Sequence, residues 1–182
     1  MSSWKTIVDK YYPEGSRLRD IYLRHSRSVA DLALAINEAK ALGLDPARVE
    51  EAAMLHDVGI FLTRAEALDC HGDAPYIAHG YLGADLLRAE GYPEEDARVA
   101  ERHTGTGLTF AEAFRLGLPE DRNYMPETEL ERLVAYADKF YSKSGDMERK
   151  SLAQVRRSLG RHGSDTLARF ERLHSRYSLA DE

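Results

Sequence analysis

Four histidines and two aspartates occupy positions from which their side chains could share metal ions. Three of the histidines fall on the apolar stripes of predicted helices, and the fourth falls at a helix end just before the glycine-rich turn Thr104–Gly107. A carboxylate on an apolar face is costly unless a charge compensates it, and a divalent cation does so well. Helices that point such side chains at one centre are a common way to build a metal site. The candidate ligands are His25, His56, Asp57, His79, His103 and Asp138.

Each candidate also has an ordinary structural explanation. A lone histidine on an apolar face is more often a hydrogen-bonded core residue, a His-Asp pair is common by chance, and Asp138 could pair with Arg or Lys. The coincidence favours metal binding, because successive predicted segments each supply a candidate. Adjacent helical residues point about 100° apart, so His56 and Asp57 reach one ion only near a helix end. We expect Gly59 to end that helix as a left-handed C-cap.

Helical periodicity dominates the segments that must position these residues. Asp45 and Pro46 predict the start of a helix that reaches His56, and Pro93 predicts one that reaches His103. Thr63 with Glu66, and Thr109 with Glu112, predict capped short helices. No segment favours a strand, so we predict an all-α, single-domain helical bundle. The remaining predicted helices cover about 18–43, 76–90 (closed by Gly91), 126–141, 151–161 and 165–177.

Composition limits the functions that are open to the chain. The 182 residues are 43% hydrophobic and 31% charged, with no apolar run long enough for a membrane span and no secretory signal. A single cysteine, Cys70, excludes thiolate metal cages and fits a cytoplasmic location. The net charge of -6 argues against bulk nucleic acid but leaves a small anionic substrate open. We interpret the arginine-rich stretch after Lys143 as a solvated helical surface.

The ordered set of candidate ligands resembles the HD superfamily of metal-dependent phosphohydrolases. His56-Asp57-Val58-Gly59 is similar to the H-D-x-G variant called HDIG, and the resemblance runs from about His25 to Lys139. It implies an HD core over about 18–142 with a helical extension over about 151–177. It also implies that His25, His56, Asp57 and Asp138 bind one metal.

The same resemblance implies a second metal. In members with two extra histidines these bind another ion, and the paired aspartate bridges both; His79 and His103 match those positions, as in HD-type hydrolases of dinucleoside polyphosphates. We therefore expect Asp57, His79 and His103 to act at the catalytic centre as well as to bind metal. Gly91-Tyr92-Pro93 is similar to the signature of the HD-GYP branch, but it precedes His103 here, which argues against that branch.

These inferences predict hydrolysis of a phosphoester or phosphoanhydride bond in a small, nucleotide-like molecule by a metal-bound hydroxide. Mixed imidazole and carboxylate ligands suit one or two ions of Fe, Mn, Co, Ni or Zn, and a pair roughly 3.5–4 Å apart could clamp a phosphate. Candidate phosphate contacts are Lys139, Arg102 and the backbone of Gly105. A di-iron HD-type oxygenase and a non-catalytic metal-bound sensor are the alternatives. Substrate, metal identity and oligomeric state, a homodimer among the options, stay open.

Overall fold

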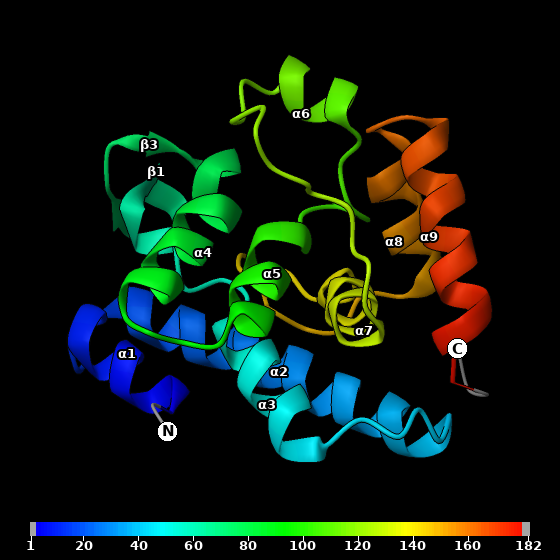
Figure 1. Cartoon of the computed structure of the whole chain (residues 1–182), viewed down its shortest axis with the longest axis horizontal. Helices are drawn as coiled ribbons and strands as arrows, with labels where there is room; N and C mark the ends of the chain where they lie inside the picture. The colour runs from blue at the N-terminus through cyan, green and yellow to red at the C-terminus, as the bar shows by residue number, and fades with distance from the viewer. Residues whose placement is uncertain (1–2, 180–182) are drawn as a thin grey trace.

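The computed structural model describes residues 3–179, and within them helices account for most of the ordered structure (Figure 1). The predicted all-α fold is confirmed. The helices are α1 Trp4–Tyr11, α2 Arg17–Ala39, α3 Pro46–Leu55, α4 His79–Ala89, α5 Glu94–Arg102, α6 Phe110–Arg115, α7 Glu129–Asp138, α8 Leu152–Gly160 and α9 Ser164–Tyr177. Short 3₁₀ segments cover Ile60–Leu62, Glu66–Leu68 and Tyr76–Ala78.

Helix α2, with 23 residues, is the longest helix in the described part of the chain. Its apolar stripe is buried, as predicted, and it packs against α3 and α7. Helix α7 lies near the centre of the view in Figure 1, between the α4–α5 pair and the α8–α9 pair. This arrangement brings the ends of α3, α5 and α7 together beside the middle of α2.

Helix ends follow the predicted capping residues in most places. The Asp45 side chain accepts a hydrogen bond from the Ala47 amide at 3.0 Å, ahead of Pro46 at the first helical position. Thr109 and Glu112 form the predicted reciprocal capping box of α6. Gly91 closes α4 with a φ of +75°, a conformation that glycine adopts without steric cost.

Gly59 does not act as the predicted left-handed C-cap, since its φ is −85°. The glycine serves close packing instead: a Cβ there would lie 2.3 Å from the carbonyl oxygen of His79 and 2.5 Å from the amide nitrogen of Gly83. The missing side chain therefore lets α4 approach the segment that carries His56 and Asp57.

The segment after Gly59 also differs from the prediction. Thr63 forms no capping box with Glu66; its hydroxyl donates to the Ile60 carbonyl at 2.7 Å, and the residues enter a small sheet. Strand β1 (Thr63–Ala65) pairs antiparallel with β2 (Cys70–His71) and parallel with β3 (Ala74–Pro75). Strands of two or three residues are too short to show an alternating pattern, so periodicity could not reveal them.

The two C-terminal helices are amphipathic and complete the core. Val155 and Leu159 of α8, with Phe170 and Tyr177 of α9, join the buried cluster around α7. Helix α7 ends at Asp138, so Tyr141 lies beyond the helix on which its spacing had placed it. Among the described residues, no helix has both the length and the apolar character needed to cross a bilayer. The division into an HD core and an extension stays a prediction.

Candidate metal centre

The predicted ligands converge at one buried place. They come from five segments of the chain, and each side chain is buried. His25 lies within α2, His79 is the first residue of α4, and Asp138 is the last residue of α7. His56 and His103 are the C-cap residues of α3 and α5. Helix ends therefore aim most of the donors inward, and the end of α3 lets both His56 and Asp57 face the same centre.

One half of the cluster gathers around Asp138 and one oxygen of Asp57. His25 Nε2 lies 3.0 Å from Asp138 Oδ1 and 3.1 Å from Asp57 Oδ2. His56 Nε2 lies 3.2 Å from Asp57 Oδ2 and 3.5 Å from Asp138 Oδ1. One donor atom from each of these four residues lies within 4.8 Å of all the others, which is compact enough for a single ion.

The other half gathers around the second oxygen of Asp57. Asp57 Oδ1 lies 3.4 Å from His79 Nε2 and 3.3 Å from His103 Nε2, and the two imidazole nitrogens are 3.0 Å apart. Asp57 thus directs one oxygen to each half of the cluster. This is the arrangement that a carboxylate bridging two ions requires.

Backbone carbonyls fix the orientation of three of the imidazoles. Nδ1 of His56, His79 and His103 donates to the carbonyl three residues earlier, at 2.6, 2.7 and 2.7 Å. A proton held on Nδ1 leaves the Nε2 lone pair directed at the centre. Metal-binding histidines are commonly oriented by such a hydrogen bond on the other ring nitrogen.

The donor set fits a divalent transition metal. Within residues 3–179, His56 Nε2 and both oxygens of Asp57 are buried without a hydrogen bond of good geometry, although Lys143 Nζ lies within ion-pair distance of Asp57 Oδ2. Buried polar atoms normally have partners, and imidazole with carboxylate is the ligand mixture that Fe, Mn, Co, Ni and Zn accept. The buried atoms and their chemistry therefore point to a cation at this place, while its identity stays open.

The carboxylates and imidazoles shift one another's protonation. Burial opposes the charge on His56, but Asp57 and Asp138 outweigh it and raise the pKa of His56 to about 9. Burial likewise opposes the charge on the two aspartates, yet nearby lysines and histidines hold the pKa of both carboxyls well below the usual range. Burial and the neighbouring His103 lower the pKa of His79 to about 3. His79 is consequently neutral and available as a donor at any physiological pH.

Two lysines contact the aspartates from the open side of the cluster. Lys143 Nζ lies 2.6 Å from Asp57 Oδ2, and Lys139 Nζ lies 2.7 Å from Asp138 Oδ2. Lys139 also donates to the His103 carbonyl at 3.2 Å. Sequence reasoning chose Lys139 from its position beside Asp138 but missed Lys143, which lies in an irregular segment without periodicity.

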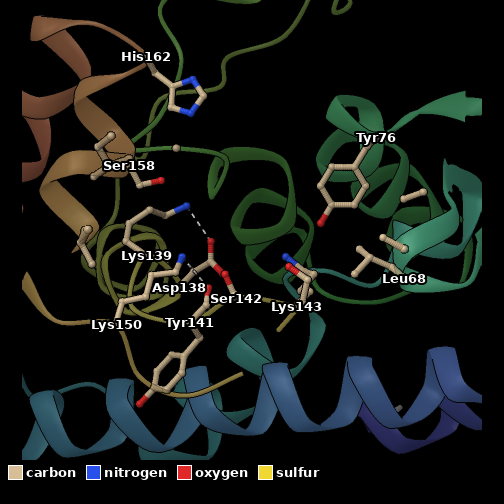
Figure 2. Close-up of a pocket in the computed structure, with 16 residues that line it drawn as sticks. Leu68, Tyr76, Asp138, Lys139, Tyr141, Ser142, Lys143, Lys150, Ser158 and His162 are labelled. Carbon is tan, nitrogen blue, oxygen red and sulfur yellow. Dashed lines mark hydrogen bonds and ion pairs between the residues drawn. The ribbon is translucent and has the colours of Figure 1, made fainter. Parts of the chain in front are cut away.

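A pocket of about 440 Å³ opens beside these lysines. We call it the lysine pocket, after Lys139, Lys143 and Lys150 in its wall. Figure 2 shows Lys139 and Lys150 on one side of Asp138, with Lys143 and Tyr76 on the other. Three ammonium groups beside a buried carboxylate cluster form a surface that favours phosphate oxygens.

The three predicted substrate contacts separate in the structure. Lys139 and Gly105 line the lysine pocket. Arg102 does not: its guanidinium is buried between α5 and α7, at 2.8 Å from Glu127 and 3.0 Å from Glu131. Adjacency to His103 does not bring Arg102 to the cluster, because its side chain turns toward Glu127 and Glu131 instead.

The other three histidines lie outside the cluster. His71 is exposed and pairs with Asp69 at 2.8 Å. His174 packs on Phe170 in α9 and is half-buried. His162 is exposed but lines the lysine pocket, a position that its sequence context did not reveal.

Comparison with known proteins places the chain among similar sequences. A family model described as HD domain matches residues 22–142. A tRNA (cytidine(56)-2'-O)-methyltransferase of Thermoplasma volcanium is 37% identical over 168 residues, which cover 92% of this chain and 44% of that protein. The enzyme of the same name from Picrophilus torridus is 32% identical, over 87% of this chain and 42% of its own length. The chain thus spans less than half the length of these two relatives.

Further similarity comes from an archaeal sequence and from solved structures. An uncharacterized protein of Methanocaldococcus jannaschii is 43% identical over 108 residues, 59% of this chain and 56% of that protein. The HD domain of the L. monocytogenes phosphodiesterase PgpH superposes with a TM-score of 0.56 at 18% identity, covering 97% of this chain and 88% of that chain. Its complex with cyclic-di-AMP gives the same TM-score over 96% of this chain and 84% of that chain. At this identity the likeness shows a shared fold.

Proposed function

The chain belongs to the HD-domain family, and from this membership we propose that it is a metal-dependent phosphohydrolase. We propose further that it cleaves a phosphoester or phosphoanhydride bond in a small, nucleotide-like substrate. The observation that carries the proposal is that the metal-ligand cluster adjoins the lysine pocket. Asp57 faces two groups of nitrogen and oxygen donors, and Lys143, which lines the pocket, contacts that same carboxylate.

His25, His56, Asp57 and Asp138 would hold one ion, and Asp57 with His79 and His103 a second. Bound divalent ions supply Lewis-acid activation of phosphate oxygens and a water of lowered pKa. The backbone-anchored imidazoles keep the donor nitrogens in place, so ligand positions need little rearrangement.

The residues around the pocket have separate tasks in this proposal. Lys139 and Lys143 donate to phosphate oxygens and hold the scissile group beside Asp138. Burial raises the pKa of Tyr76 to about 12, so its hydroxyl stays protonated and can act as a neutral donor at the pocket wall. Tyr76 also stacks on His79 with ring centroids 4.7 Å apart, which excludes water from that side. In this proposal Asp57, His79 and His103 lie closest to the reacting phosphorus.

The lysine pocket favours hydrolysis over the two alternatives. An oxygenase acting on an uncharged substrate, or a sensor of an uncharged ligand, would have no need for Lys139, Lys143 and Lys150 around the pocket. The methyltransferase activity named in two relatives is not transferred to this chain, because the match covers less than half of each. That bulk nucleic acid is not a partner stays a prediction, since those names refer to tRNA.

The test is elemental analysis joined to a phosphate-release assay over a panel of nucleotides and nucleotide diesters. We expect bound transition metal and turnover of at least one compound in the wild type, with less metal and no turnover in His56→Ala. His71→Ala is the matched control, because His71 is exposed and contacts Asp69 rather than the cluster. Release of no product by the metal-loaded wild type, or full metal retention by His56→Ala, would contradict the proposal.

A further inference from the structure

A second hollow adjoins the lysine pocket on the side of α8. Its volume is about 430 Å³, and it shares Ser142, Ser144, Lys150 and Ser158 with that pocket. We call it the arginine groove, after Arg149, Arg157 and Arg161 in its wall. Lys150 lies at the junction, where Nζ donates to the Tyr141 carbonyl at 3.4 Å. The two hollows therefore form one path that leads away from Asp138.

Helical spacing explains why α8 presents arginines to this groove. Val155 and Leu159 are buried against the core. Gln154, Arg157, Ser158 and Arg161 recur at three- and four-residue steps and all line the groove. The helix thus holds one polar face over the open path while its apolar face fixes it in place.

The arginines of this helix fall into two groups. Arg156 pairs with Glu171 of α9, Nε to Oε1 at 2.7 Å, and so joins the two C-terminal helices. For Arg157 and Arg161, no carboxylate in the part of the chain that the structure describes lies at ion-pair distance. Arg156, Arg157 and Arg161 are all exposed, as predicted for a solvated helical surface, and Arg157 and Arg161 also line the concave wall of the groove.

Positive charge exceeds negative charge along the groove. Four cationic side chains, those of Arg149, Lys150, Arg157 and Arg161, line it together with the carboxylates of Asp146 and Glu148. Asp146 Oδ1 accepts a hydrogen bond from the Glu148 amide at 3.0 Å within its own turn. In a chain of net charge -6 this local excess favours an anion in the groove.

We propose that the arginine groove binds a second phosphate group of the substrate while the lysine pocket holds the scissile one. The inference rests on the proposed function and adds a substrate class, namely small molecules with at least two phosphate groups, joined either as an anhydride or through a nucleoside. Arg149, Lys150, Arg157 and Arg161 lie beyond residue 142, where the match to the family model ends. The groove is therefore built by the part of the chain that lies outside that match.

Equilibrium binding tests the proposal independently of turnover. The metal-loaded protein, at a constant free-metal concentration, is titrated with AMP, the linear dinucleotide pApA and inorganic tripolyphosphate. We expect Arg157→Gln/Arg161→Gln to weaken at least one of the latter two by about 5- to 20-fold, with AMP unchanged. Arg156→Gln is the matched control, because it removes the same charge from the same helix outside the groove.

The outcomes separate the groove from the hydrolase proposal. A loss confined to tripolyphosphate identifies an anhydride chain as the ligand, and a loss confined to pApA identifies a diester-linked second phosphate. Equal affinities of the double variant and the wild type for both pApA and tripolyphosphate would refute phosphate binding by the arginine groove, even if hydrolysis is intact. The expected loss in a protein that hydrolyses nothing would support the groove and contradict only the hydrolase.

Discussion

Nζ of Lys143 lies 2.6 Å from Oδ2 of Asp57, the oxygen that also faces His25 and His56. Burial opposes the charge of this lysine, but Asp57 outweighs it and raises the lysine pKa above its ordinary value. The ammonium group is therefore a built-in cation at a predicted metal ligand. A divalent ion bound by Asp57 must share or displace this contact.

Replacing Lys143 with Met should have opposite effects on the two forms of the protein. Without metal, loss of the compensating charge should lower the free energy of unfolding by about 3 kcal/mol. With metal, removal of the competing ammonium should tighten ion binding. Thermal unfolding in chelator and metal titration calorimetry measure the two effects. Lys150→Met is the control, since Lys150 contacts a carbonyl rather than a carboxylate; equal metal affinity in all three proteins would refute the competition.

Metal uptake should depend on pH through His56. Burial opposes the charge on this histidine, but the carboxylates of Asp57 and Asp138 outweigh it and raise its pKa from 6.5 to about 9. The protonated histidine therefore contributes fully to the free energy of unfolding below pH 6.5, and this contribution is lost as pH rises through 9. Metal binding needs the neutral ring, so affinity should rise by about tenfold per pH unit up to pH 9. Denaturant unfolding of metal-free protein and competitive metal titration from pH 6.5 to 9 test both trends. A flat affinity profile would show that His56 binds no proton in this range.

Gly59→Ala should disrupt the metal centre through packing alone. Any residue can adopt the backbone conformation of Gly59, whose φ is −85°. The added Cβ, however, would lie 2.3 Å from the His79 carbonyl oxygen. Helix α4 would have to move, and His79 with it, at a cost of about 2 kcal/mol or more. Gly160→Ala provides the contrast, because nothing lies within 4 Å of its Cβ position, and it should stabilise α8 by about 0.5–1 kcal/mol. Chemical denaturation and metal content are the measurements; normal stability of Gly59→Ala would invalidate the close-approach explanation.

Arg102→Ala should affect stability rather than substrate affinity. The guanidinium lies 3.0 Å from the buried Glu131, so its removal leaves a buried carboxylate unpaired, at a cost of about 3 kcal/mol. Arg98→Ala removes an exposed pair with Glu94 on the same helix and should cost less than about 0.5 kcal/mol. Denaturant unfolding distinguishes the two variants. A higher KM for Arg102→Ala at unchanged stability would restore Arg102 as a substrate contact.

Helix positions could be predicted from the sequence where a regular local pattern is present. The stripe of α2, the cap at Asp45 and the box at Thr109 are local signals, and they predicted three helices with boundaries close to those observed. The candidate ligands were found because they recur at helix ends and apolar faces, and the structure brings all of them together.

The parts that could not be predicted depend on contacts distant in sequence. Gly59 is small because α4 crosses it, and no local signal distinguishes that role from a C-cap. Lys143 and the arginine groove lie on or beside an irregular loop, so their approach to the cluster depends on how α8 packs against the core. The position of Arg102 also depends on distant residues, since its ion-pair partners Glu127 and Glu131 come from a later segment of the chain.

His79→Ala should remove one metal ion and leave the other. His79 lies 3.4 Å from Asp57 Oδ1 and belongs only to the group with His103, whereas His25, His56 and Asp138 form the other group with Asp57. The metal content should therefore fall from two ions per chain to one by elemental analysis. His71→Ala, which alters an exposed histidine outside both groups, should keep two. Retention of two ions by His79→Ala would exclude His79 as a ligand. Loss of both ions from His79→Ala would mean that neither donor group binds metal without the other. Asp57 would then not bridge two independently filled metal positions.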